Sequence, residues 1–283
     1  MNAIPTIVGY GLREALRRKV FAVVLLLTVA FLFLYWLGNH YAFRDVQHIQ
    51  PPAGIDARAF AGAFIFGLAM FATLFLGVVL AVFLTLGAVR GDAERGLLQP
   101  LLVRPVSRQT LLLARWLGAI LVCTPYVAAV YAASMVITGL TGHWWPDSIV
   151  VPALELAGGV ALVAALSLLG SVYLSSTANG IAIFMVFGAG LVAGLLGEIG
   201  HALSSHTLER AAKIAAWTVP FEALYQDALR EITANTTGLT GFLLQLGPFG
   251  GANTGGPAVR LWACAYLVLV GAVAAFGFSR RDL

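Results

Sequence analysis

One segment between two long apolar runs is rich in charge, residues 89–115 (VRGDAERGLLQPLLVRPVSRQTLLLAR). Seven of its side chains are charged, although only 11% of the whole chain is. Long apolar runs flank the segment on both sides, and charge at this density is unfavourable in hydrocarbon, so the chain must leave a bilayer here. Such a segment suits a surface that another protein binds, or a basic loop that lies at lipid headgroups.

Two helix starts are predicted within this segment. Asp92 can cap a short helix over residues 94–103. That helix ends at Arg104, because a residue before proline is pushed out of the α region. Ser107 is then placed to cap the next helix, which returns to the membrane. Four leucines of the short helix are available for docking: Leu97, Leu98, Leu101 and Leu102.

The composition is that of an integral membrane protein. Hydrophobic residues make up 60% of the 283 residues, and the mean hydropathy is +0.89. A soluble protein of this length needs more charge than 17 Lys or Arg and 13 Asp or Glu residues supply. The net charge of +4 does not indicate nucleic-acid binding, because the basic residues lie beside the apolar runs. Cys123 and Cys264 both fall in apolar runs and predict no disulfide framework.

Six membrane spans are predicted, each long enough to cross a hydrocarbon core of about 30 Å. They cover residues 20–38, 61–88, 112–137, 152–174, 180–199 and 259–278. Residues 1–19 are predicted to form an amphipathic helix in the membrane interface. With the N-terminus inside, eleven Lys or Arg residues lie on the inner side and six on the outer side. This bias places both termini and the 89–111 loop in the cytoplasm. We therefore expect a single all-α transmembrane domain, multi-pass in the plasma (inner) membrane.

The loop over residues 200–258 is predicted on the extracytoplasmic side. It holds two amphipathic helices, over 207–216 and 220–232, followed by a glycine-rich linker over 238–257. One side of the second helix is apolar: Phe221, Leu224, Tyr225, Ala228 and Leu229. Its other side is charged: Glu222, Asp227, Arg230 and Glu231. Both helices are expected at the outer surface, where they either cover the spans or lie on lipid.

Two stretches of the charged segment carry a family resemblance. Glu94-Arg95-Gly96-Leu97-Leu98 and Arg104-Pro105-Val106-Ser107-Arg108 resemble the loop after the second span of ABC-2-type permeases, the membrane subunits of ATP-binding-cassette exporters. Leu97 stands where the family more commonly has threonine. The resemblance extends over the chain as six spans with a large outer loop before the last. It implies that the 89–111 loop contains a coupling helix that docks on an ATPase subunit. The implied docking residues are Asp92, Glu94, Arg95, Gly96, Leu97, Leu98, Arg104, Pro105 and Arg108.

The sequence contains no catalytic motif. No GxxxxGK[ST] occurs, and neither of the two lysines, Lys19 and Lys213, lies beside a glycine-rich loop. Since a P-loop needs that lysine to reach the phosphates, this chain is not expected to hydrolyse ATP. We predict no cofactor in this chain, with ATP and magnesium bound by the partner ATPase. Glu198 and His201 are three residues apart, but one such pair without cysteine predicts no metal site.

Ion-coupled transport is disfavoured by the distribution of ionisable residues. Proton- and sodium-driven transporters place such residues inside the membrane. The predicted span interiors lack them, and the nearest carboxylates, Glu155 and Glu198, lie at the outer ends of their spans. Coupling to a separate ATPase requires no ionisable group in the membrane.

Gly190 and Gly194 form a GxxxG pair in the fifth span. Such a pair lets two helices approach closely, either within one chain or across a dimer seam. The family resemblance implies a homodimer, because two six-span halves enclose one translocation path.

The sequence thus favours the permease subunit of an ABC-2-type exporter. It forms the pathway in contact with membrane lipid, and its apolar interior suits a hydrophobic or lipid-like cargo. The alternative is a non-transporting membrane anchor or assembly factor that acts through its extracytoplasmic loop.

Overall fold

A computed structural model describes residues 19–46, 56–88, 107–236 and 256–280, together with Gly9 and Thr240. No strand occurs in this part of the chain. Six of its helices are long and apolar enough to cross a membrane, and this confirms the predicted all-α membrane fold with six spans. The helices are α2 (Lys19–Val46), α3 (Ala57–Thr85), α6 (Arg108–Gly142), α7 (Val150–Tyr173), α8 (Ser176–Ala202), α9 (His206–Thr218), α10 (Phe221–Glu231) and α12 (Gly256–Ser279).

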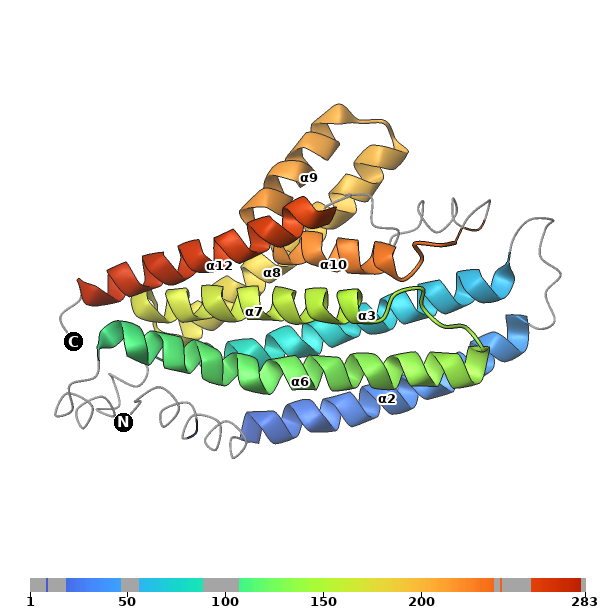
Figure 1. Ribbon diagram of the computed structural model, residues 1–283, viewed down its shortest axis with the longest axis horizontal. Helices are drawn as coiled ribbons and strands as arrows, with labels where there is room; N and C mark the ends of the chain where they lie inside the picture. The colour runs from blue at the N-terminus through green and yellow to red at the C-terminus, as the bar shows by residue number, and fades with distance from the viewer. Residues whose placement is uncertain are drawn as a thin grey trace.

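The six long helices run side by side along one axis of the molecule (Figure 1). The end of the bundle at which α3 ends and α6 begins is called here the loop end; α2 begins and α12 ends there as well. The helices are longer than the predicted spans, and α6 has 35 residues. Its start is where the sequence places it, because the Ser107 side chain caps α6 by accepting a hydrogen bond from the Thr110 amide at 3.1 Å.

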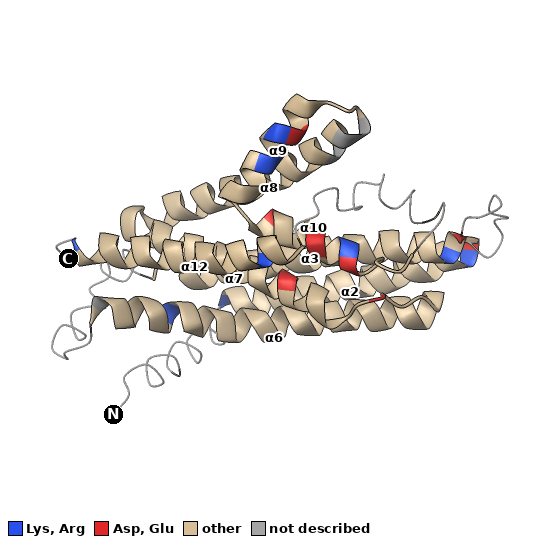
Figure 2. Ribbon diagram, turned by 45° about the horizontal axis from the view of Figure 1, so that its top comes forward, with Lys and Arg blue, Asp and Glu red and all other residues tan. Residues whose placement is uncertain are grey.

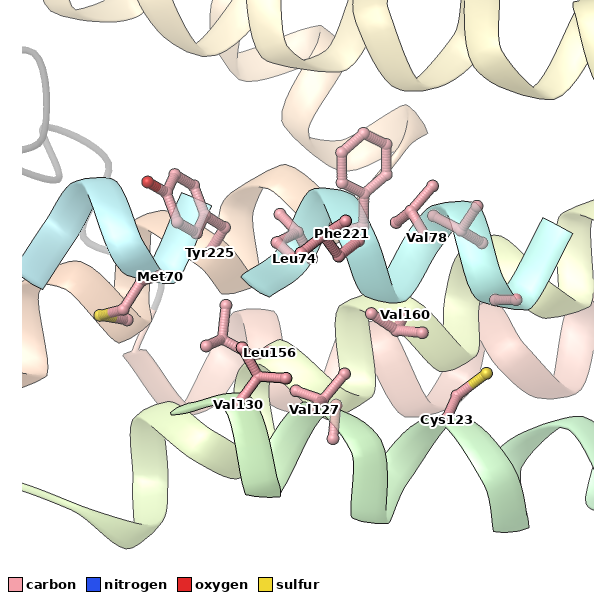
Figure 3. Close-up of a cluster of buried hydrophobic side chains, with 14 of the residues drawn as sticks. Met70, Leu74, Val78, Cys123, Val127, Val130, Leu156, Val160, Phe221 and Tyr225 are labelled. Carbon is pink, nitrogen blue, oxygen red and sulfur yellow. The ribbon is translucent and has the colours of Figure 1, made fainter. Parts of the chain in front are cut away.

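The core of the bundle lies where α3 meets α6, α7 and α10 (Figure 3). Close approach of the backbones depends on Gly77 of α3. A Cβ atom at this position would lie 2.8 Å from Val160 of α7 and 2.9 Å from Val127 of α6, nearer than carbon atoms pack. Any larger residue would therefore push α3 away from both neighbours.

The two short helices of the loop over residues 200–258 differ in their surroundings. α9 forms a hairpin with α8 that leans away from the bundle (Figure 1). α10 lies inside the bundle, and every residue from Phe221 to Leu229 is buried. The apolar side of α10 is the predicted one. On its predicted charged side, Glu222 and Asp227 are buried, whereas Arg230 is exposed and Glu231 is partly exposed. The burial of α10 corrects the expectation that both helices lie at the outer surface. The two buried carboxylates have partners within the protein, which offsets the cost of burying them.

Candidate functional site

Most of the segment with the predicted docking residues lies outside the described part of the chain. This applies to Asp92, Glu94, Arg95, Gly96, Leu97, Leu98, Arg104 and Pro105, and also to all but Gly9 and Lys19 of the interfacial helix predicted over residues 1–19. Arg108 is the first residue of α6. The structure shows where the segment is anchored. Leu86 caps the end of α3, and Ser107 caps the start of α6.

Residues close to both anchors pack in one apolar cluster at the loop end. Ala88 after α3 and Leu111 and Leu112 of α6 pack in a cluster with residues of α7 and α12. The remaining buried members are Leu168, Val172, Ala274 and Phe278. Because three helices and the residue Ala88 that follows α3 share this cluster, a force applied to the intervening loop acts on the end of α3 and on α6 together.

A cluster of four charged residues joins α10 to α7 and α12 in the opposite half of the bundle. The guanidinium of Arg260 on α12 donates from Nε to Glu155 Oε1 at 2.6 Å. Its Nη2 atom lies 3.0 Å from Asp227 Oδ2 and 2.7 Å from Glu231 Oε1. Figure 2 shows how sparse charge is along the other spans. These four residues are called here the Arg260 cluster.

The ion pairs of the Arg260 cluster hold α7, α10 and α12 together. The side chains of Glu155 and Asp227 are each 4% exposed, and that of Arg260 is 37% exposed. Two carboxylates at this depth are stable only if a charged partner and hydrogen bonds compensate them. Asp227 also accepts a hydrogen bond from the Gly256 amide at 3.1 Å, which fixes the first turn of α12.

The Arg260 cluster corrects one premise of the sequence analysis. Glu155 lies in the second turn of α7, far from the loop end, and its side chain is buried. Glu222 and Asp227 are buried with it, because α10 enters the bundle. Because the bundle contains buried carboxylates, the distribution of ionisable residues no longer argues against ion-coupled transport. The sequence feature that could have indicated this cluster is the spacing of Asp227 and Glu231, which are one helical turn apart and so share a face of α10.

The GxxxG pair of α8 faces α10 within the same chain. A Cβ atom at Gly190 would lie 2.6 Å from the ring of Phe221, and one at Gly194 would overlap the carboxylate of Glu222. Glu222 is held by Gln226, whose Nε2 donates to its Oε1 at 2.5 Å. The two glycines thus make room for the start of α10 against α8.

Neither a metal centre nor a catalytic constellation is visible in the described residues, which contain no group of three His, Cys, Asp or Glu side chains able to hold a metal. The side chains of Glu198 and His201 lie outside the description. The polar contacts described above join helices to one another.

Comparison with known proteins identifies the family. A family model described as ABC-2 family transporter protein matches residues 6–283, which is nearly the whole chain. A comparison with curated proteins gives no match.

Proposed function

Because this chain belongs to the ABC-2 transporter family, we propose that it is the permease subunit of an ATP-binding-cassette exporter. The observation that carries the proposal is the family match over residues 6–283, and the six apolar helices agree with it. Proteins of this family are membrane components that work with an ATP-binding-cassette ATPase. The energy for transport accordingly comes from a separate chain that binds ATP and magnesium.

The 89–111 loop is proposed as the docking site for that ATPase. Its anchors, Leu86 and Ser107, cap α3 and α6 at the same end of the bundle. A partner bound there acts on both helices, and through their shared apolar cluster on α7 and α12. We place this end, with both termini, in the cytoplasm, and the chain in the plasma (inner) membrane.

Two copies of the chain are proposed to enclose one pathway. Many large apolar side chains of α2, α8 and α12 are exposed, among them Leu26, Met185 and Val268. In a membrane such residues face lipid or a second copy of the chain. A cargo that partitions into lipid is compatible with these surfaces, and we propose a hydrophobic or lipid-like cargo.

Reconstitution tests the proposed function. The chain is placed in liposomes with and without its copurified ATPase, and a fluorescent phospholipid analogue serves as the transported probe. We expect ATP-dependent movement of the probe between leaflets only when the ATPase is present. Movement of the probe by the chain alone would contradict an ATPase-coupled permease. ATP hydrolysis without movement of the probe would contradict the lipid-like cargo and leave the coupling to the ATPase standing.

A further inference from the structure

Asn179, in the first turn of α8, is buried at the loop end and connects three helices. Its Nδ2 atom donates to the backbone carbonyl of Ser167 on α7 at 2.8 Å. It also donates, at 3.3 Å, to the carbonyl of Leu86, the residue that caps α3. A side-chain amide nitrogen has two hydrogens, and both are used here on carbonyls of different helices. Asn179 with these two carbonyls is called here the amide bridge.

The residues around the amide bridge are shaped to admit it. A Cβ atom at Gly170 of α7 would overlap Asn179 Oδ1, so only glycine leaves room for the amide. At Gly180, the next residue of α8, a Cβ atom would lie 2.9 Å from Leu86 Cδ1. Two consecutive residues of α8 therefore hold Leu86, one by its carbonyl and the other by its side chain.

The amide bridge is not explained by stability alone. Asn179 is fully buried, yet among the described residues its Oδ1 atom has no hydrogen-bond donor. A buried acceptor without a donor is unfavourable, and an apolar residue would avoid that loss. Such violations of local packing rules are concentrated at sites that serve function.

Beyond the amide bridge, α3 and α8 are separated by a groove. It has a volume of about 610 Å³ and is lined by apolar side chains of both helices, including Val82, Phe83, Phe184 and Met185. The farther part of α8 leans away from the bundle with α9 (Figure 1). α8 is thus held to the end of α3 at this point, and the groove separates the two helices beside it.

We propose that Asn179 is the positioning residue that transmits a displacement of the 89–111 loop from the end of α3 to α8. Leu86 lies three residues before that loop, so a partner that moves the loop moves the Leu86 carbonyl first. The amide bridge then carries the displacement to α8, and the contacts of Gly190 and Gly194 carry it on to α10. This inference rests on the proposed function, because the ATPase supplies the force.

The test measures movement of α8 directly and needs no knowledge of the cargo. Nitroxide labels are attached to Leu121→Cys on α6 and Leu195→Cys on α8, both exposed positions, after Cys123 and Cys264 are replaced by serine. The distance between the labels is measured by electron–electron resonance in the complex with the ATPase, in nanodiscs, without nucleotide and after trapping with ATP and vanadate.

Two variants disturb the contact of α8 with Leu86, one at the amide bridge and one at Gly180 beside it, and each has a matched control. Asn179→Leu removes both donors without adding charge, and Thr73→Val removes a buried hydrogen bond that stays within α3. Gly180→Ala presses on Leu86, whereas a Cβ atom at Gly188 of the same helix meets nothing within 4 Å, so Gly188→Ala is its control. If one variant fails to fold, the other still tests the inference.

In the parent protein we expect nucleotide trapping to change the distance between the labels. In Asn179→Leu and Gly180→Ala most of this change should be lost, because the displacement of Leu86 no longer reaches α8. The rate of ATP hydrolysis in both variants should equal that of the parent. The two control variants should show the same change in distance as the parent. A full distance change in either variant would overturn the role of Asn179. Absence of a bound ATPase or of any nucleotide response in the parent would instead overturn the proposed function, and the inference with it.

Discussion

The Arg260 cluster and the amide bridge are both polar contacts in an apolar bundle, but they differ in strength. In the Arg260 cluster, a guanidinium binds three carboxylates at 2.6 to 3.0 Å. In the amide bridge, a neutral side chain makes two hydrogen bonds, at 2.8 and 3.3 Å. Charge-assisted hydrogen bonds are about twice as strong as neutral ones. The Arg260 cluster is therefore suited to hold α10 in place, whereas the amide bridge joins α8 to the end of α3 more weakly.

The largest effect is expected from Arg260→Ala. The substitution leaves Glu155 and Asp227 buried without their cation, and we expect the free energy of unfolding to fall by about 3 kcal/mol. This is the low end of the range for a broken buried ion pair, because the Arg260 side chain is itself 37% exposed. Unfolding in detergent, followed by intrinsic fluorescence, measures the loss. Arg230→Ala removes an exposed cation from α10 and should change the free energy by no more than about 0.5 kcal/mol. Equal effects of the two substitutions would contradict the bracing role of Arg260.

The contact between α8 and α10 is tested by Gly190→Ala. The added methyl group must displace the ring of Phe221, so we expect a loss of about 2 kcal/mol in the free energy of unfolding. The same substitution at Gly188, where the space is open, should be nearly neutral. If both substitutions are neutral, Gly190 does not set the distance between α8 and α10.

A smaller effect separates uncompensated charge from lost packing in the Arg260 cluster. When Glu155→Gln is added to Arg260→Ala, one buried carboxylate without a partner disappears, and about 1 kcal/mol of stability should return. Glu155→Gln alone should not stabilise the protein, because its carboxylate is then removed from an intact ion pair. Additive losses in the double variant would show that packing, and not charge, is what Arg260 contributes.

The smallest effect on stability is expected from Asn179→Leu. Neutral hydrogen bonds contribute about 1 kcal/mol each, and a buried leucine regains part of this, so the net loss should stay below about 1 kcal/mol. Unfolding in detergent measures this loss, with Thr73→Val as the control variant. A loss as large as that of Arg260→Ala would make Asn179 a structural brace, and the contrast between the two polar contacts would disappear.

Much of the fold follows from hydropathy, since all six predicted spans correspond to helices of the structure. The second outer helix was also predicted at nearly its observed bounds, and Phe221, Leu224 and Tyr225 on its predicted apolar side are buried. Its place in the bundle was not predicted, because helical periodicity identifies an apolar face but not what packs against the opposite face.

The polar contacts were harder to predict from the sequence. Glu155 and Arg260 are 105 residues apart, and nothing local to either residue indicates the pairing. Asn179 stands in a short polar turn between two spans, where a solvated side chain is the ordinary expectation. The docking residues of the 89–111 loop remain a prediction from the family resemblance. The central claim of the account, that an ATPase drives this chain through the loop, depends on them.

That claim is tested most directly by isolating the chain from its native membrane and quantifying the P-loop ATPase that copurifies with it. The protein is compared with Glu94→Ala/Arg104→Ala in the loop and with Arg210→Ala/Lys213→Ala on α9 as a control of equal size. We predict that the ATPase copurifies in a fixed ratio with the parent and with the α9 variant and is lost from the loop variant. Undiminished ATPase with the loop variant, or no ATPase with the parent, would contradict an exporter that is driven through this loop.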